Sequence, residues 1–448
     1  MQHNSQNPVK DQIDDTERFD TGLGSGLCTA ITGQKSDGKD LKVWALEFSS
    51  SLAVDEQILQ SLIRIIDQGN ISLATKIIDT LLLLNPTSIH LQFLYGTALF
   101  KDGRDVEAIN AYKTLLNQKN MNQNDKVISE IIYNTHNNLG LIFKKLGLLE
   151  DAKKTLEIAV GSHSQKAEAY NNLGTVYLEM ADISGAQKSY LRAVKLEPND
   201  PSYYWNLHST SETVITAKHI LGLCIKKGPR YEQGVLTLAG LEALTGNTLH
   251  FNNLRDNGWE NHPLVQSIEW VLALPNIPEL HFNRWTLFDS MAGRVSKSRP
   301  FYEFGVWMGA SFQYLARHFS KGYGFDTFEG LPEDWGNITK GSYSARGRIP
   351  KVLNGDFVVG KFTESLPAFF SIPRPVASII NYDADLYSST LTALNHCHSV
   401  TDDATILIFD EFLVNKNWQS DEHAALIEFC QDKNLTYEVL AVSFFTKQ

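Results

Sequence analysis

Two apolar runs in this sequence, at 379–382 and 404–409, each end in acidic residues. Each run has the length and composition of a buried parallel strand. Parallel strands end at the same edge of a sheet, so we expect their acids to meet there. Like charges that meet repel unless a proton or a cation joins them, and carboxylates are good ligands for a hard cation. The four acids are Asp383, Asp385, Asp410 and Glu411.

Simpler roles for some polar residues of this region stay open. Asp385 precedes the expected helix 386–394 and would be a suitable N-cap. His396 and His398 face different sides of a helix and have no partner four residues on, so we do not expect them to bind a metal.

A second chemical signal lies between residues 301 and 326, which read as strand, glycine turn, helix, strand and acid. In a parallel sheet such a turn lets the backbone approach a ligand, and the final acid can hold ribose hydroxyls. The pattern therefore predicts a nucleoside site, although a glycine turn formed for packing alone is the alternative. Trp307 stands where a dinucleotide site needs glycine, whereas the acid Glu303 fits the ammonium of S-adenosylmethionine.

The elements that position these residues belong to an ordinary soluble protein. The 448 residues, with 43% hydrophobic and 20% charged residues, suffice for two or three domains. The net charge of -11 disfavours a nucleic-acid partner. Four scattered cysteines, a polar start and the lack of a long apolar segment lead us to expect a cytoplasmic protein that does not bind membranes.

Upstream of the glycine turn the sequence repeats with a period of 34 residues. Residues 170–198 and 136–164 align at almost every large or small position, and looser copies precede them. They resemble the tetratricopeptide repeat, in which glycine and alanine let two helices approach and large residues fill the space between them. Ten residues are inserted near 117–126, and the period fades after Leu207, as expected for a capping repeat.

The resemblance to this repeat implies a protein or peptide partner on the concave face. A spacer or a dimerisation element is the alternative, so a homo-oligomer stays open. We divide the chain into a mostly irregular segment 1–50, a helical repeat domain 51–250, an aromatic adaptor of short helices 251–300 and an α/β domain 301–448. In the adaptor, Asn283, Arg284 and Trp285 could contribute to the substrate mouth, but the expected role of Arg284 is to stack on the indole of Trp285 for structural reasons.

Four motifs of the last domain resemble the macrocin-type sugar O-methyltransferase family, class I enzymes that use S-adenosylmethionine. They are GFDTFEGLPEDW, VGKFTESLP, NYDADLYSST and ILIFDEF, in that order, and the resemblance covers about 299–430. It implies a doubly wound α/β fold, with the segment 336–347 as a mobile lid. It also implies a Mg²⁺ ion at the sheet edge and a sugar or small polyol as methyl acceptor.

The same resemblance assigns roles to individual residues. Glu303, Gly305 and Gly309 would surround the methionine and sugar parts of the cofactor, and Asp326 would accept from both ribose hydroxyls. The implied adenine contacts are Gly360, Lys361 and Phe362, the implied magnesium ligands are Asp383, Asp410 and Glu411, and the implied base is Asp385.

We therefore expect an S-adenosylmethionine-dependent O-methyltransferase whose repeats recruit a partner or the acceptor and do not build the active site. Two other classes of protein are the alternatives. One is a non-catalytic repeat scaffold with a relic methyltransferase domain, which the retained acids disfavour. The other is a nicotinamide-dependent oxidoreductase, which Trp307 disfavours.

Overall fold

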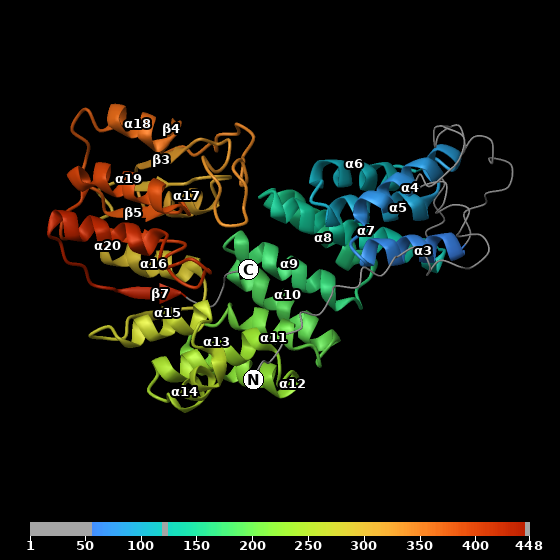
Figure 1. The fold of residues 1–448 in the computed structure, drawn as a ribbon, viewed down its shortest axis with the longest axis horizontal. Helices are drawn as coiled ribbons and strands as arrows, with labels where there is room; N and C mark the ends of the chain where they lie inside the picture. Colours follow the sequence, from blue (N-terminus) through green and yellow to red (C-terminus); the bar gives the residue numbers. More distant parts are fainter. Residues whose placement is uncertain (1–55, 119–123, 444–448) are drawn as a thin grey trace, which may run out of the picture. The chain divides into compact units, whose positions relative to one another are not determined.

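A computed structural model describes residues 56–118 and 124–443 of the chain (Figure 1). The predicted irregular segment 1–50 and part of the predicted insertion 117–126 lie outside these residues. The chain forms two compact units, of which one ends at Ile142 and the other begins at Phe143. None of the described helices is both long and apolar enough to cross a membrane.

Helical pairs make up the described part of the first unit. They are α3 (Glu56–Asp67) with α4 (Ile71–Leu84), and α5 (Ile89–Lys101) with α6 (Asp105–Leu116); α7 (Lys126–Lys145) then continues into the second unit. Gly96 shows why glycine recurs in these pairs. A Cβ atom there would lie 2.5 Å from the ring of Tyr112, which is fully buried beside Ala108. The predicted role of small residues between the helices is confirmed.

The second unit continues the helical pairs. Gly174 and Tyr190 repeat the contact of Gly96 and Tyr112, with a Cβ atom 2.7 Å from the ring. The helices are α8 (Leu149–Ser162), α9 (Ala167–Glu179), α10 (Ile183–Leu196), α11 (Pro201–His208), α12 (Val214–Lys227), α13 (Glu232–Leu244), α14 (Leu249–Leu254), the π-helical turn η2 (Arg255–Trp259) and α15 (Pro263–Leu272).

The fading period after Leu207 does not mark a free end of the array, contrary to the sequence-based expectation of a cap with a polar outer face. Leu221 and Leu236 of this region are buried in one hydrophobic cluster with Phe282 of the adaptor and with Val442, near the last of the described residues. These helices lose the repeat pattern because their apolar faces fit other elements instead of a further repeat.

A five-stranded parallel sheet forms the centre of the C-terminal region. Its order is β4-β3-β2-β5-β6, and Phe301 lies opposite both Gly322 and Ile379. The order reverses at β2, where doubly wound sheets leave a crevice for ligands. The strands are β2 (Phe301–Phe304), β3 (Gly322–Asp326), β4 (Gly355–Val359), β5 (Ile379–Tyr382) and β6 (Ile406–Phe409).

Helices cover both faces of this sheet, because alternate residues of each strand point to opposite sides. Phe301 and Ile379 pack in the cluster that includes α16 (Arg284–Arg294) and α17 (Ala310–Leu315). Tyr302 and Tyr382 pack in the cluster on the other face. That face carries α18 (Phe362–Phe369), α19 (Tyr387–Cys397) with the short η3 (His398–Val400), and α20 (Glu422–Lys433).

The predicted adaptor 251–300 packs with both neighbouring domains, through a pair of strands and through a shared hydrophobic cluster. Strand β1 (Glu279–His281) of this adaptor pairs in parallel with β7 (Ala441–Ser443) as a separate two-stranded sheet. One hydrophobic cluster also joins Leu178 and Tyr190 of the repeats to Trp285 and Phe312. The packing therefore continues across the predicted boundaries at 250/251 and 300/301.

Candidate functional site

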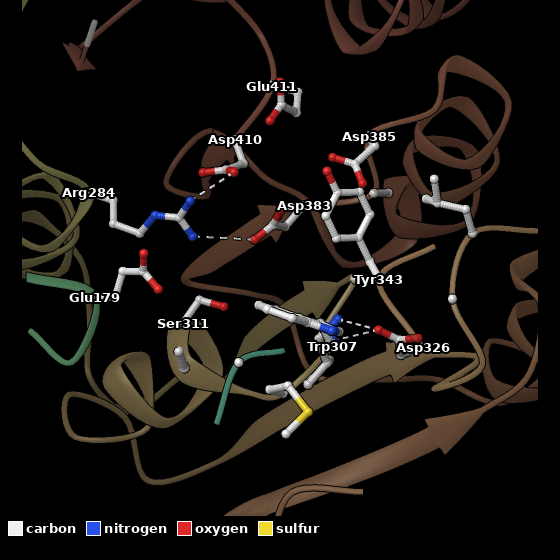
Figure 2. Close-up of a pocket in the computed structure, with 18 of the residues that line it drawn as sticks. Glu179, Arg284, Trp307, Ser311, Asp326, Tyr343, Asp383, Asp385, Asp410 and Glu411 are labelled. Atoms are coloured by element: carbon white, nitrogen blue, oxygen red, sulfur yellow. Dashed lines mark hydrogen bonds and ion pairs between the residues drawn. The ribbon is translucent and has the colours of Figure 1, made fainter. Parts of the chain in front are cut away.

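A cavity of about 580 Å³ lies at the carboxyl ends of the strands, where the strand order reverses (Figure 2). Residues that end or follow four strands line it, namely Gly305, Asp326, Asp383 and Asp410. Its wall also includes Lys144 and Glu179 from the ends of the repeat helices α7 and α9, joined by an ion pair of 3.5 Å. The expectation that the repeats stay outside the site is wrong for this cavity.

Asp326 closes one side of the cavity through backbone hydrogen bonds. Its Oδ2 accepts from the N–H groups of Val306 and Trp307, both at 2.7 Å, and its Oδ1 accepts from the N–H of Phe328 at 2.6 Å. A carboxylate has about four acceptor positions. Roughly one is therefore left for a ligand, which is less than the predicted contact with two ribose hydroxyls requires.

The glycine turn after β2 has packing reasons for its glycines. Gly305 has φ +87°, and a Cβ atom there would lie 1.8 Å from the carbonyl oxygen of Asp383. Gly309, at φ +82°, would meet Pro350 at 2.6 Å. Gly305 thus allows β2 to end against Asp383, the residue after β5, whereas Gly309 leaves room for Pro350. The contact at Gly305 brings the nucleoside side and the acidic side of the cavity together.

The glycine turn carries two bulky residues, Trp307 and Met308, and both contact a turn of the repeats. Trp307 has φ +48°, and with Met308 it lies on Gly147 in the turn between α7 and α8. A Cβ atom at Gly147 would lie 2.6 Å from Cγ of Met308 and 2.9 Å from the indole of Trp307. The side chains that depart from the usual glycine pattern therefore fit a contact with a repeat turn.

Glu303 is fully buried in β2 and is absent from the cavity lining. Its Oε1 accepts from the hydroxyl of Ser311 at 2.8 Å, and its Oε2 accepts from the amide of Asn381 at 3.3 Å. Burial raises the pKa of Glu303 to about 8, against the effect of these two hydrogen bonds. Ser311, which lines the cavity, donates its hydroxyl to Glu303. Because Glu303 itself is fully buried and outside the lining, this arrangement favours a role through Ser311 over the predicted direct contact with the cofactor.

Two of the three residues predicted to contact the adenine line the cavity, and the third does not. Lys361 and Phe362 line the cavity at the start of α18, whereas Gly360 lies outside the lining and donates its N–H to the carbonyl oxygen of Asp326. The predicted lid contributes Tyr343, whose ring centre is 6.3 Å from that of Trp307. Ala345 of the same segment is buried, so part of the predicted lid packs on the domain.

The acidic edge holds a guanidinium group. Nη2 of Arg284 lies 3.0 Å from Oδ2 of Asp410, and Nη1 lies 3.7 Å from Oδ2 of Asp383 (Figure 2). Burial and the charge of Asp410 raise the pKa of Asp383 well above its usual value, and Arg284 opposes them. The guanidinium of Arg284 contacts these acids, and the expected stacking on Trp285 is not among the contacts of the described residues. Asn283, Arg284 and Trp285 all line the cavity, as the alternative role at the substrate mouth predicted. No sequence pattern indicates a pairing between residues so far apart.

Asp385 lines the cavity with a left-handed backbone, at φ +60°. The N-cap of α19 is Leu386, so Asp385 stands one residue before the cap position. Asp and Asn adopt this backbone conformation more readily than other residues with side chains. The position therefore suits a carboxylate that faces a ligand.

The predicted magnesium ligands do not form an oxygen cage as they are arranged. Arg284 lies between two of them, and the carboxylate of Glu411 accepts from the amide of Asn415 at 3.2 Å. Within residues 56–118 and 124–443, no three His, Cys, Asp or Glu side chains are grouped to hold a metal ion. This donor set therefore does not fit Mg²⁺.

Comparison with known proteins identifies the repeats. Residues 56–219 match the family described as Psidin, N-terminal TPR repeats region. The predicted tetratricopeptide repeats are thus confirmed. The BBSome complex member BBS4 of Xenopus tropicalis is 30% identical over 135 residues, which are 30% of this chain and 24% of that protein. The chain therefore spans a small part of that relative.

Solved structures with similar helices have low sequence identity. The pilF protein of Pseudomonas aeruginosa is 16% identical with a TM-score of 0.39, and the match covers 52% of this chain and 99% of that one. YrrB, described as a TPR protein with an unusual peptide-binding site, is 18% identical with a TM-score of 0.32, over 47% of this chain and 96% of that one.

Proposed function

We propose that this chain is an S-adenosylmethionine-dependent O-methyltransferase that acts on a hydroxyl group of a sugar or another small polyol. One observation carries the proposal: a single cavity at the reversal of the strand order has the glycine turn and Asp326 on one side and Asp385 with the acidic edge on the other. Fold alone would not justify the assignment, since many functions share doubly wound sheets.

The residues of the first side suit a nucleoside cofactor. The cavity volume of about 580 Å³ is in the usual range of small-molecule sites. Asp326 keeps one acceptor position for a ribose hydroxyl, and Phe362 offers an apolar surface to an adenine. Trp307 and Tyr343 close the same side with aromatic rings. These residues fit the cofactor, with Glu303 acting behind Ser311.

The reaction needs a base at the acceptor side. S-adenosylmethionine, when bound, supplies a methyl group on a sulfonium ion. Asp385 would take the proton of the acceptor hydroxyl, whose oxygen would receive the methyl group as the carbon–sulfur bond of the bound cofactor breaks. Asp385 then releases this proton to solvent, and the products are a methyl ether and S-adenosylhomocysteine. Arg284 supplies N–H donors that orient acceptor oxygens beside Asp385. No step here uses the magnesium ion that the family resemblance implies.

A non-catalytic repeat scaffold is the second candidate function. The matched family is described by its TPR repeats, and the relative from Xenopus tropicalis is described as a member of a complex. Tetratricopeptide repeats commonly bind protein or peptide partners. In this role the cavity would be a relic, and the repeats would bind a protein or peptide, or a second copy of the chain.

Calorimetry with S-adenosylhomocysteine and the full chain distinguishes the two functions. We expect one molecule bound per chain, and Asp326→Ala should weaken binding by about 2 kcal/mol, roughly thirtyfold, because it removes a charged acceptor and loosens the turn. Asp356→Ala is the matched control, since Asp356 pairs with Lys321 at the surface of β4. A folded wild-type chain that binds no S-adenosylhomocysteine would favour the scaffold.

A further inference from the structure

Arg284 occupies the place where the sequence led us to expect a divalent cation. Its guanidinium joins Asp410, at 3.0 Å, and Asp383, at 3.7 Å. The two carboxylates are only about a fifth exposed, at 20% and 23% of their side-chain surface. Charges so far removed from water need a partner, and here a guanidinium provides it.

The backbone on both sides of Arg284 is held by the repeat helices of the same unit. The side chain of Asn283 donates to the carbonyl oxygen of Ser209 at 2.9 Å and accepts from the N–H of Thr286 at 3.0 Å, which caps α16. The indole N–H of Trp285 donates to the carbonyl oxygen of Leu178. Arg284 is therefore placed by residues of its own helix start and by the repeats.

The charge of Arg284 is permanent. Asp410, Asp383, Glu179 and Glu303 all raise the pKa of Arg284, in that order of effect, while burial opposes them. A divalent cation bound to Asp383 and Asp410 would have to lie against this guanidinium or displace it. The Arg284 side chain is 41% exposed, so water reduces the repulsion between the two cations, but at contact distance this repulsion still disfavours the metal.

We propose that Arg284 is the cation of the acidic edge and that no divalent metal binds there. The guanidinium holds Asp383 and Asp410 in place, and its remaining N–H donors face acceptor oxygens in the cavity. It is thus a positioning residue for Asp383 and Asp410 and a specificity residue for an acceptor rich in oxygen atoms. The acceptor part rests on the proposed function, whereas the charge arrangement does not.

Titration with Mn²⁺, followed by electron paramagnetic resonance on the full chain, tests this assignment. The wild-type protein should show no site at the edge tighter than roughly 1 mM. Arg284→Gln should gain a Mn²⁺ site at least tenfold tighter, because the carboxylates then lack their partner. Arg294→Gln is the control, since Arg294 lies at the other end of α16 and pairs with the exposed Glu279. This control should gain no site.

Two results would overturn the proposal. One is a stoichiometric Mn²⁺ site in the wild-type protein that Asp383→Asn removes. The other is a folded Arg284→Gln variant that gains no Mn²⁺ site. If Arg284→Gln does not fold, the comparison of wild type with Asp383→Asn still decides between a metal and a guanidinium. The readout uses no S-adenosylhomocysteine, so a failure of the proposed methyltransferase function gives a separate result.

Discussion

The carboxylates on the two sides of the cavity have different kinds of partner, backbone N–H groups on one side and a guanidinium on the other. Asp326 accepts from three backbone N–H groups, two of them in the glycine turn that precedes it by about twenty residues. Asp383 and Asp410 instead share one guanidinium, and Arg284 is 126 positions away from Asp410 in the chain. The first side is held by its own turn, while the second side depends on a residue brought in by the tertiary fold.

This difference has a chemical consequence. Three fixed backbone donors occupy most of the acceptor positions of Asp326, so that side of the cavity is suited to binding rather than to proton transfer. On the other side Asp385 lines the cavity two residues after Asp383, whose carboxylate lies 3.7 Å from the guanidinium of Arg284. A general base needs a free acceptor position for the proton, and Asp326 has few left. We therefore assign the role of base to Asp385, on the acidic side of the cavity.

Removal of the base should have the largest effect. Asp385→Asn keeps the shape and tolerates the left-handed backbone at φ +60°, so the fold should persist. Methyl transfer should fall by roughly two to four orders of magnitude, with S-adenosylhomocysteine affinity within twofold of wild type. Mass spectrometry of native protein with cofactor and candidate sugar nucleotides first identifies an acceptor, and initial rates with that acceptor then give the change.

Asp356→Asn serves as the control for this measurement, since it neutralises an exposed carboxylate on the edge strand β4. Normal turnover in Asp385→Asn would show that the base is another group. A parallel loss of cofactor affinity would instead indicate that Asp385 shapes the cavity as a whole.

The sequence predicted what is local in this molecule. The strand at 379–382 and the residues after it, the turn at Gly305 and the 34-residue period all follow from patterns within a few tens of residues. Arg284 at the acids, Glu179 in the cavity wall and the contact of Gly147 with Met308 join segments that are far apart in the chain. Periodicity carries no information on such pairs, because it describes one element at a time.

A smaller effect is expected at the repeat turn that contacts the glycine turn. In Gly147→Ala the new Cβ atom would meet the side chains of Met308 at 2.6 Å and Trp307 at 2.9 Å, so these side chains must shift, and we expect the shift to disturb the Trp307 amide that holds Asp326. S-adenosylhomocysteine binding should weaken roughly tenfold, in line with the cost of overpacking. Isothermal titration calorimetry gives this change, and circular dichroism verifies that the variant is folded.

Gly103→Ala is a closely matched control for Gly147→Ala. Gly103 occupies the same kind of turn, between α5 and α6, at φ +75°, and a Cβ atom there would meet nothing within 4 Å. Ala181, in the turn between α9 and α10, already adopts φ +63°. Backbone strain alone should therefore be tolerated, and equal losses of affinity in both variants would show that the contact with Met308 does not position the cofactor turn.

The smallest expected change concerns the buried acid beneath the cavity. The pKa of Glu303 is raised from 4.5 to about 8 by burial. Between these values only the folded chain holds the proton, so unfolding releases it and the free energy of unfolding falls as pH rises, by about 1.4 kcal/mol per pH unit at most. Glu303→Gln should flatten this fall between pH 6 and 7, as measured by urea unfolding.

S-adenosylhomocysteine affinity should change less than twofold in Glu303→Gln, because Ser311 separates Glu303 from the cavity. Glu364→Gln, at an exposed position on α18, should keep the wild-type slope. An unchanged slope in Glu303→Gln, or a large loss of affinity, would show that Glu303 is ionised and acts directly on the ligand.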